Sequence, residues 1–334
     1  MDIKRKVELV KRNTEEIVTE AELKNLLKKK NPVVYWGTSI TGKPSVAYFF
    51  PLRKLSDFIK AGFKVKVLLA DLHGALDRTP WNVLEHRYDY YEEAIKQIFK
   101  VLGTDLKKIE FVKGSEFQLK PEYSFDVLRM ATMVSIRECK RAASEVVKFG
   151  DNPHTGGLIY PIMQALDEQY LDVSAQFGGT DQRKIFMFAR ENLPKLGYEP
   201  RVEIMNPMIP GLIGKKMSSS IERSKIDLTD SEKTVREKIN KADCVAGNPD
   251  NGIMAFLKYV IMVIKEDKRE GFVVKRDKKY GGNLEFENYE EIEKAFKERK
   301  LHPLDLKNAL SEEIINLLKK VDKKKLEGLA RKAY

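Results

Sequence analysis

The chain has 334 residues, of which 42% are hydrophobic and 33% charged, and its formal net charge is +11. This composition provides enough apolar surface for a sizeable core and for two domains of ordinary size, which excludes a disordered or fibrous protein. No apolar run approaches the ~20 residues that a membrane-spanning helix needs, so a membrane protein is excluded as well.

The excess of 61 Lys and Arg over 50 Asp and Glu is compatible with a polyanionic partner, but it does not identify one. The N-terminus is charged and lacks the apolar segment of a signal peptide, which predicts a cytoplasmic location. Cys139 and Cys244 have no cysteine near them in the sequence, and the chain has only four histidines. Neither a disulfide framework nor a metal site is therefore expected.

Residues 1–30 are predicted to be helical, in two pieces. The second piece begins with a capping box, because Thr19 is followed three residues later by Glu22. Asn31 and Pro32 end this helix, since the residue before a proline is disfavoured in the helical conformation.

Segments with a β pattern and segments with a helical pattern alternate after residue 32. This alternation predicts a parallel sheet covered by helices, a doubly wound α/β fold of five strands. The predicted strands span residues 33–37, 64–70, 109–113, 173–177 and 201–205. The predicted helices between them include 46–61, 80–102 and 181–193.

Residues 116–171 carry an almost wholly helical pattern, which predicts a helical insertion in the sheet domain. Strands largely vanish after a loop rich in Gly, Lys and Ser at 211–220. The change near Ile226 predicts a first domain of residues 1–225 and a second, mainly helical domain of residues 226–334. In the second domain, helices are predicted at 231–241, 251–265, 289–300 and 303–318, with one β-like piece at 271–275.

The turn after the first predicted strand is the first candidate binding site, because open α/β sheets bind ligands at the carboxyl ends of their strands. Residues 37–45 place small side chains and the beginning of a helix there, and free backbone N–H groups at that position favour a phosphate. The turn has neither a dinucleotide fingerprint nor a Walker A motif. Taken alone, these residues therefore favour an ordinary strand–helix connection over a phosphate site.

The segment 214–220, Gly-Lys-Lys-Met-Ser-Ser-Ser, is the second candidate site. Lysine supplies a mobile positive charge and serine supplies hydroxyl donors, and both suit a triphosphate. A flexible basic linker between domains has the same composition, and composition alone favours the linker.

A polar stripe on a predicted helix is the third candidate site. Tyr160, Gln164 and Asp167 share one helix face at i, i+4 and i+7 spacing. A solvated helix surface would explain the stripe, but the Met, Ile and Leu residues around it favour a lined cavity.

The chain also contains five groups of residues that together match a known family. They are Tyr35-Trp36-Gly37 with Thr41-Gly42-Lys43-Pro44 and Val46-Ala47-Tyr48; Ala70-Asp71-Leu72-His73; Tyr160 to Asp167; Gln176-Phe177-Gly178-Gly179 with Asp181-Gln182-Arg183-Lys184; and Lys216-Met217-Ser218-Ser219-Ser220. In this order they resemble the tyrosyl-tRNA synthetases of the eukaryotic and archaeal type, from about residue 10 to about residue 325. The resemblance implies a Rossmann-like catalytic domain with a helical insertion, followed by a helical anticodon-binding domain.

The family activates tyrosine with ATP to give tyrosyl-adenylate and pyrophosphate, and then transfers tyrosine to the 3′ end of tRNA(Tyr). The resemblance implies that Tyr35 and Asp167 hydrogen-bond the phenol of the substrate. It also implies that Tyr160, Gln164 and Gln182 hold the α-amino group of the substrate.

The turn at 40–48 is similar to the His-Ile-Gly-His signature of the class, and the loop at 216–220 to its Lys-Met-Ser-Lys-Ser signature. The resemblance implies catalytic roles for Lys216, Ser218, Ser219 and Ser45. It implies that ATP contacts Gly37, Gly42, Pro44, Ser45, Tyr48, Lys216, Met217 and Ser218. Mg²⁺ is expected to accompany ATP as substrate, with no permanently bound metal or organic cofactor.

Ser45 stands where the family normally has the first histidine of its signature. A serine hydroxyl can still donate a hydrogen bond, but it is neutral and shorter. Either the other donors supply most of the charge stabilisation, or the chain has lost synthetase activity and serves another role. We favour the first reading, because electrostatic stabilisation is shared among several donors.

The resemblance further implies that Arg183 and Lys184 read the first base pair of the tRNA acceptor stem, for which a surface salt bridge is the alternative. It implies that Tyr280, His302 and Asp305 contact the first anticodon base, by stacking and by hydrogen bonds. A homodimer formed through the helical insertion is also implied. The rival functions are a tryptophanyl-tRNA synthetase and a non-catalytic RNA-binding or signalling protein descended from a synthetase.

Overall fold

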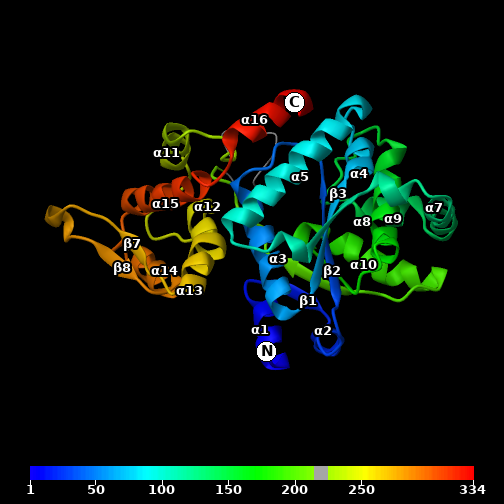
Figure 1. Ribbon diagram of the computed structural model, residues 1–334, viewed down its shortest axis with the longest axis horizontal. Coiled ribbons are helices and arrows are strands. Elements are labelled where there is room, and N and C mark those ends of the chain that lie inside the picture. The colour runs from blue at the N-terminus through cyan, green and yellow to red at the C-terminus, as the bar shows by residue number, and fades with distance from the viewer. Residues whose placement is uncertain (214–224) are drawn as a thin grey trace.

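A six-stranded sheet forms the centre of the N-terminal part of the computed structural model, which describes residues 1–213 and 225–334 (Figure 1). The strand order is β1-β6-β5-β2-β3-β4, and every neighbouring pair is parallel except β1 with β6. The strands are β1 Glu16–Val18, β2 Val33–Ser39, β3 Lys64–Ala70, β4 Ile109–Lys113, β5 Ala175–Gly179 and β6 Val202–Asn206.

The five parallel strands confirm the predicted doubly wound sheet, whereas the prediction that residues 1–30 are wholly helical is wrong. β1 lies between α1 (Ile3–Lys11) and α2 (Glu20–Leu26), and α2 begins with the predicted capping box. β1 has three residues, too few to show a period of two. Its pairing with β6 stabilises it, and the Glu15 N–H donates to Met205 O at 2.8 Å beside it.

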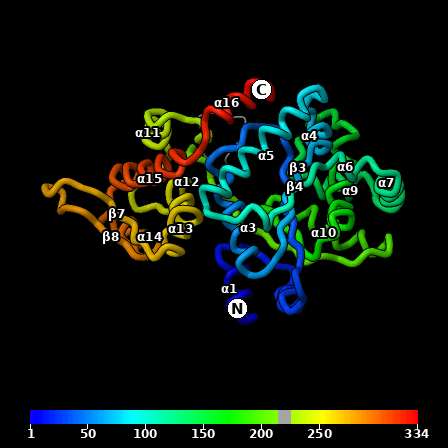
Figure 2. The backbone as a smooth tube through the Cα atoms, viewed as in Figure 1, coloured from blue at the N-terminus to red at the C-terminus, as the bar shows by residue number. Residues whose placement is uncertain are grey.

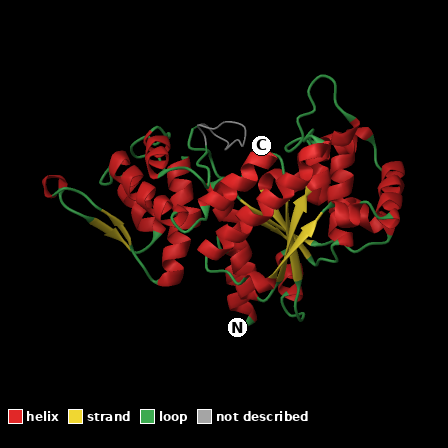
Figure 3. Cartoon of the chain, turned by 45° about the horizontal axis from the view of Figure 1, so that its top comes forward, coloured by secondary structure: helices red, strands yellow, loops and turns green. Residues whose placement is uncertain are grey.

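Helices cover both faces of the sheet (Figure 3). On one face, Val34 and Val67 pack in a core with α3 (Phe49–Ala61) and α5 (Leu84–Val101). On the other face, Tyr35 packs in a second core with helices of the insertion and with α10 (Arg183–Asn192). Neighbouring strand residues therefore serve opposite faces, as the pleat requires.

The predicted helical insertion is present, and its helices lie on the side of the sheet away from the C-terminal part (Figure 1). Its helices are α6 Ser115–Gln118, α7 Pro121–Met133, α8 Ile136–Ala142 and α9 Thr155–Tyr170. The polar stripe of the sequence lies on α9, as predicted.

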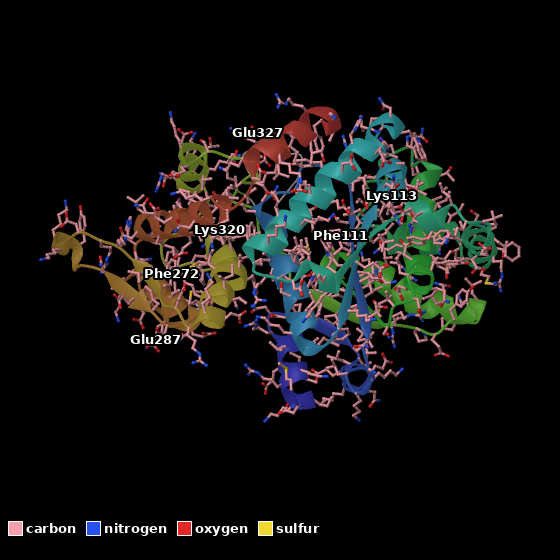
Figure 4. All side chains as sticks on the ribbon, viewed as in Figure 1. Phe111, Lys113, Phe272, Glu287, Lys320 and Glu327 are labelled. Carbon is pink, nitrogen blue, oxygen red and sulfur yellow. The ribbon has the colours of Figure 1, made fainter. Side chains whose placement is uncertain are left out.

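The part of the chain after residue 225 is mainly helical, with one small hairpin. Phe272, labelled in Figure 4, is buried on β7. The elements are α11 Glu232–Asn240, α12 Gly252–Phe256, the π-helix η7 Leu257–Met262, α13 Val263–Lys268, β7 Phe272–Val274, the 3₁₀ turn η8 Lys278–Tyr280, β8 Leu284–Phe286, α14 Tyr289–Lys297, α15 Pro303–Leu318 and α16 Lys323–Ala333.

The C-terminal helix α16 leaves the helical part and returns to α5 (Figure 2). Lys325 Nζ lies 2.7 Å from Glu93 Oε2, and the Arg87 Nε–H donates to Ala333 O at 3.2 Å. The division into domains of residues 1–225 and 226–334 stays a prediction, and these contacts tie the end of the second to a helix of the first. Within the described residues, no helix combines the length and the apolar character needed to cross a membrane.

The strand order locates the point where chain connections change direction. From β2 the chain continues through β3 to β4, whereas β5 and β6 lie on the other side of β2. The carboxyl ends of β2 and β5 therefore meet at a topological switch point, where doubly wound sheets bind their ligands.

Candidate active site

A cavity of about 490 Å³ lies at the carboxyl ends of β2 and β5. Gly178 near the end of β5 allows two cavity-lining side chains to approach the strand closely. A Cβ atom there would be 2.8 Å from Phe186 Cζ and 3.1 Å from Gln182 Cγ. The five residues predicted to hold tyrosine all line this cavity: Tyr35, Tyr160, Gln164, Asp167 and Gln182.

Asp167 forms one end of the cavity, and it is almost fully buried. Its Oδ1 accepts hydrogen bonds from Gln118 Nε2 and from the Tyr123 hydroxyl, each at 2.8 Å. Its Oδ2 has no hydrogen-bond partner within the described part of the chain. Buried polar atoms are rarely left without a partner, so Oδ2 is suited to accept a hydrogen bond from a ligand.

Burial also controls the charges at this end of the cavity. It raises the pKa of Asp167 to about 7, against the hydrogen bonds from Gln118 and Tyr123, which lower it. Burial lowers the pKa of His73 to about 4. His73 Nε2 lies 3.9 Å from Asp167 Oδ2, but the imidazole is neutral near pH 7, so the two do not form an ion pair.

Tyr35 supplies a second hydroxyl at the same end. Its oxygen accepts a hydrogen bond from Gln176 Nε2 at 2.5 Å, which leaves its own proton for another acceptor. Burial and the neighbouring acids Asp167, Glu168 and Glu203 raise the pKa of Tyr35 well above its ordinary value. The Tyr35 hydroxyl is therefore a donor at any physiological pH.

Amide and hydroxyl groups form the other end of the pocket. Gln164 Nε2 donates to Gln182 Oε1 at 3.1 Å, so α9 and the 3₁₀ turn η4 (Thr180–Gln182) meet there. The Tyr160 hydroxyl lies 3.1 Å from Ser39 Oγ at the end of β2. The amide and hydroxyl oxygens of these groups can accept hydrogen bonds, as a substrate ammonium group requires.

The turn between β2 and α3 borders the cavity, as the sequence predicted. Four of the described residues predicted to contact ATP line it, namely Gly37, Gly42, Ser45 and Tyr48, whereas Pro44 is buried and does not. The Tyr48 hydroxyl lies 3.0 Å from Thr38 Oγ1 across the turn. Ser45 Oγ accepts a long hydrogen bond of 3.4 Å from the Ala47 N–H at the start of η1 (Val46–Tyr48).

Four predicted residues of the second signature, Lys216, Met217, Ser218 and Ser219, lie outside the described residues. Lys225, which follows that segment, lines the cavity and is buried. Its Nζ lies 3.1 Å from Asp227 Oδ1. Within the described residues, no group of three or more His, Cys, Asp or Glu side chains is placed to hold a metal ion.

Arg183 and Lys184 begin α10 at the surface, and both have acidic partners. The Arg183 guanidinium contacts the Glu16 carboxylate at 2.6 and 2.9 Å and holds the pKa of Glu16 below its usual range. Lys184 Nζ lies 2.7 Å from Glu145 Oε1. The surface salt bridges named as the alternative are thus present, and a nucleic acid would have to compete with them.

Tyr280, His302 and Asp305 lie in the helical part, far along the chain from the cavity. Tyr280 is 65% exposed on the turn of the β7–β8 hairpin, and the Lys279 ammonium lies 4.9 Å from the centre of its ring. His302 caps α15 by accepting from the Leu304 N–H at 3.2 Å, and Asp305 lies in the first turn of that helix.

Arg276 connects the Tyr280 turn to the start of α15. Its guanidinium donates to Gly282 O at 2.9 Å and to Lys300 O at 3.4 Å. The structure therefore ties the hairpin turn to the segment that precedes His302, although the two are far apart in the sequence.

Sequence reasoning assigned no role to Gln176 and Lys225, which line the cavity, or to Gln118 and Tyr123, which contact Asp167. Gln118 and Tyr123 reach Asp167 from the insertion, across 49 and 44 residues, and no spacing in the sequence indicates such a contact. Gln176 lies within a quoted motif, and its position in an otherwise apolar strand was the available signal.

The sequence model of the family described as "tRNA synthetases class I (W and Y)" matches residues 27–319. The chain is 47% identical to the cytoplasmic tyrosine--tRNA ligase of Danio rerio over 98% of its length, and it spans 63% of that relative. It is 46% identical to the cytoplasmic tyrosine--tRNA ligase of Saccharomyces cerevisiae, covering 98% of this chain and 86% of the relative.

Among solved structures, the tyrosyl-tRNA synthetase of Archaeoglobus fulgidus complexed with L-tyrosine superposes with a TM-score of 0.89. The two are 40% identical, and the match covers 97% of this chain and 99% of that one. The archaeal protein was crystallised with tyrosine, and the fold that surrounds the cavity is shared over nearly the whole of both chains. The chain belongs to the class I tRNA synthetases for tryptophan and tyrosine, in the branch of the tyrosine--tRNA ligases.

Proposed function

We propose that this protein activates L-tyrosine with ATP to give tyrosyl-adenylate and pyrophosphate, and then transfers tyrosine to the 3′ end of tRNA(Tyr). The main support for this proposal is a hydrogen-bond acceptor and a hydrogen-bond donor that lie together at the buried end of the cavity. Asp167 Oδ2 lacks a donor within the described residues, and the Tyr35 hydroxyl has a proton to give. A phenol hydroxyl is both donor and acceptor, so it satisfies both atoms at once.

Phenylalanine and tryptophan fit this end less well. Phenylalanine would leave Asp167 Oδ2 and the Tyr35 proton buried without partners, which costs the desolvation free energy of both groups. An indole offers one N–H donor and no acceptor, so it leaves the Tyr35 proton unmatched. The pair therefore favours tyrosine over both competitors.

The other end of the cavity orients the reacting group. Tyr160, Gln164 and Gln182 hold the α-amino group, which directs the substrate carboxylate toward the turn formed by residues 37–48. The carboxylate attacks the α-phosphate of ATP and pyrophosphate leaves, so the step needs no general base on the protein. The contribution of the chain is to position the two substrates and to neutralise charge.

Phosphate binding is assigned to Ser45, to the adjacent turn with Gly37, Gly42 and Tyr48, and to the segment with Lys216, Met217, Ser218 and Ser219, in which Lys216 supplies a positive charge; Pro44 does not line the cavity. The buried side chain of Lys225 adds a positive charge beside the cavity. Mg²⁺ commonly binds to substrate phosphates with one or two protein carboxylates, and the described residues offer no cage of three or more. We therefore expect Mg²⁺ to bind as part of Mg–ATP, where it supplies positive charge to the phosphates.

For tRNA, we assign the acceptor stem to Arg183 and Lys184 and the anticodon to Tyr280, His302 and Asp305. The exposed ring of Tyr280 and the link through Arg276 support a stacking platform beside the start of α15. Cytoplasmic location follows the names of the relatives.

A homodimer through the insertion completes the proposal. Four large apolar side chains in α7, just before it and at the start of α8 are between 63% and 72% exposed. Exposed apolar side chains gathered in one segment support an interface there. The four residues are Leu119, Phe125, Leu128 and Ile136.

Amino-acid-dependent ATP–pyrophosphate exchange tests the proposed function. Tyrosine should support exchange by the purified protein, while phenylalanine and tryptophan should not. Exchange with tryptophan would indicate a tryptophanyl-tRNA synthetase instead. Absence of exchange with every amino acid would favour a non-catalytic descendant of the family.

A further inference from the structure

A row of polar side chains crosses the sheet beneath the phenol end of the cavity. Tyr35 on β2 is in register with Gln176 on β5, and Gln176 is in register with Glu203 on β6. Side chains at paired positions of neighbouring strands project to the same face, so these three lie side by side. Each of them is at most 2% exposed.

The far end of this row lacks hydrogen-bond donors. Gln176 Oε1, both carboxyl oxygens of Glu203 and both carboxyl oxygens of Glu168 have no partner within the described residues. Glu168 is the neighbour of Asp167 on α9 and is fully buried. Two ionised carboxylates in this position would be uncompensated buried charges, which are strongly destabilising.

Two cations lie near these acids, and most of their N–H groups donate to other residues, while the Arg201 Nε–H donates to neither carboxyl and has no partner within the described residues. The Arg190 guanidinium donates to Glu22 at 2.9 and 3.0 Å and to Val18 O at 3.3 Å. The Arg201 guanidinium donates to Gln169 Oε1 at 2.8 Å and to Glu199 O. Burial raises the pKa of Glu203 and of Glu168, and mutual repulsion and Glu22 raise that of Glu203 further, against the opposing effect of Arg190 and Arg201.

Hydrogen-bond directions along the row follow from the ligand. A phenol hydroxyl donates one hydrogen bond, and Asp167 Oδ2 can accept it. The phenol oxygen can then accept a hydrogen bond, and the Tyr35 hydroxyl must donate it. The Tyr35 oxygen must then accept from the Gln176 NH₂ group, as it does in the structure. Gln176 Oε1 is then left without a donor within the described residues, and Glu203 is its neighbour in register on the next strand.

A neutral carboxylic acid supplies that donor. We propose that Glu203 is a buried carboxylic acid that donates to Gln176 Oε1, and that Glu203 and Gln176 are positioning residues that aim the Tyr35 proton into the cavity. This inference rests on the proposed function, because it assigns the selectivity for a phenol hydroxyl to residues that do not touch the substrate. If the Gln176 amide turned over, Tyr35 would donate to Gln176 and offer the phenol only an acceptor.

Glu203→Gln and Glu203→Leu separate this role from a structural one. Glutamine keeps a donor for Gln176 Oε1, whereas leucine removes it. We expect Glu203→Leu to lower the tyrosine-to-phenylalanine ratio of kcat/KM in pyrophosphate exchange by on the order of tenfold, the effect of one hydrogen bond. The loss should fall on the KM for tyrosine, and Glu203→Gln should stay within about twofold of the parent.

Phenylalanine acts as the internal reference, because a general packing defect would slow both substrates alike. Glu110→Leu is the matched control, since Glu110 is in register with Lys66 in the same row but lies at the exposed edge. An unchanged ratio in Glu203→Leu would overturn the inference. If Glu203→Leu does not fold, Gln176→Met is measured in its place. This variant removes the C=O and the NH₂ of the amide at similar volume, and an unchanged ratio in it would overturn the inference.

An infrared measurement tests the neutral acid without any activity. At pH 7 the parent should show a carboxylic-acid C=O stretch that decreases in Glu203→Gln, and an unchanged band would contradict the proposal. This readout also distinguishes the two possible failures. A protein without tyrosine exchange but with the band would refute the proposed function alone, whereas normal exchange with an unchanged ratio in the leucine variant would refute the inference alone.

Discussion

Two buried acids near the phenol end of the cavity differ in their neighbours and therefore in their chemistry. Asp167 receives two hydrogen bonds on one oxygen, which favours its ionised form against burial. Glu203 receives none within the described residues, and burial raises its pKa well above the ordinary value, which favours the neutral acid of our proposal. Asp167 can therefore accept a hydrogen bond from the phenol hydroxyl, while Glu203 can fix the direction of the hydrogen bonds through Gln176 and Tyr35.

The balance at Asp167 makes stability depend on pH. In the unfolded chain Asp167 loses its proton near its ordinary pKa of 3.8, but in the folded chain it keeps the proton to about pH 7. Between these values the folded state binds more protons, so stability falls as pH rises. Asp167→Asn removes this effect, and we expect its stability relative to the parent to increase from pH 4 to pH 7 and then level off.

Urea unfolding of parent and Asp167→Asn at pH 5 and pH 8 measures this change. The variant should gain on the order of 1 kcal/mol or more relative to the parent between the two values. It should at the same time lose the preference for tyrosine over phenylalanine. A relative stability that is the same at both pH values would show that burial does not perturb Asp167.

Ser45 is the residue where the sequence departs from the family, and the structure gives its hydroxyl only a 3.4 Å hydrogen bond from the Ala47 N–H. Ser45→Ala should therefore remove about one neutral hydrogen bond to the phosphates, ~0.5–1.5 kcal/mol, and slow adenylate formation roughly 2- to 13-fold. Single-turnover formation of tyrosyl-adenylate measures this rate. A loss of several hundredfold would mean that this hydroxyl carries a major part of the charge stabilisation.

At the scale of elements, α5 holds the turn that borders the cavity. The Arg87 guanidinium donates to Thr41 O at 2.5 Å and to Ile40 O at 3.4 Å, and the Tyr91 hydroxyl donates to Gly42 O. The same guanidinium lies 4.6 Å from the centre of the Tyr334 ring. Helix α16 is thus connected through Arg87 to the turn assigned to ATP.

Arg87→Ala should raise the KM for ATP by roughly tenfold and leave the KM for tyrosine within about twofold, because the tyrosine pocket lies on other elements. Lys325→Ala provides the control, since it removes a contact between α16 and α5 that does not reach the turn. Equal changes in both KM values for Arg87→Ala would indicate a general loss of packing. An unchanged KM for ATP would remove Arg87 from the support of the turn.

The sequence indicated the elements that have enough residues to show a period. The five parallel strands and the helices of the insertion are of this kind, and so is the capping box of Thr19 and Glu22. β1 and β8 have three residues each; pairing with the distant strand β6 decides the conformation of β1, and pairing with the preceding strand β7 decides that of β8. Short motifs identified Tyr35 and Asp167. The contacts of Asp167 with Gln118 and Tyr123 could not be predicted, because they join residues 49 and 44 positions apart in the sequence.

At the scale of the whole molecule, the cavity and the Tyr280 turn lie in different parts of the structure (Figure 1). A tRNA bound at both must follow the surface between them, and the net charge of +11 favours such a polyanion. Phosphate contacts release counterions, so charging of tRNA should weaken as salt is added.

Asp305→Ala should separate the two steps of the reaction. It should impair aminoacylation of tRNA and leave tyrosine-dependent pyrophosphate exchange intact, because the first step needs no tRNA. Glu312→Ala, an exposed change on the same helix, should affect neither step. Loss of both steps in Asp305→Ala would indicate a folding defect, and unimpaired charging would remove Asp305 from the anticodon site.

In the proposed function, the Tyr35 and Asp167 pair selects the substrate by its phenol hydroxyl. Tyr35→Phe tests this selection most directly, because it removes one hydroxyl and keeps the ring that fills the core. The measurement is the ratio of kcat/KM for tyrosine and phenylalanine in pyrophosphate exchange. We predict a strong preference for tyrosine in the parent and a ratio lower by roughly tenfold or more in Tyr35→Phe, with phenylalanine exchange unchanged or faster. An unchanged ratio in Tyr35→Phe, or a parent that accepts phenylalanine as readily as tyrosine, would contradict the account.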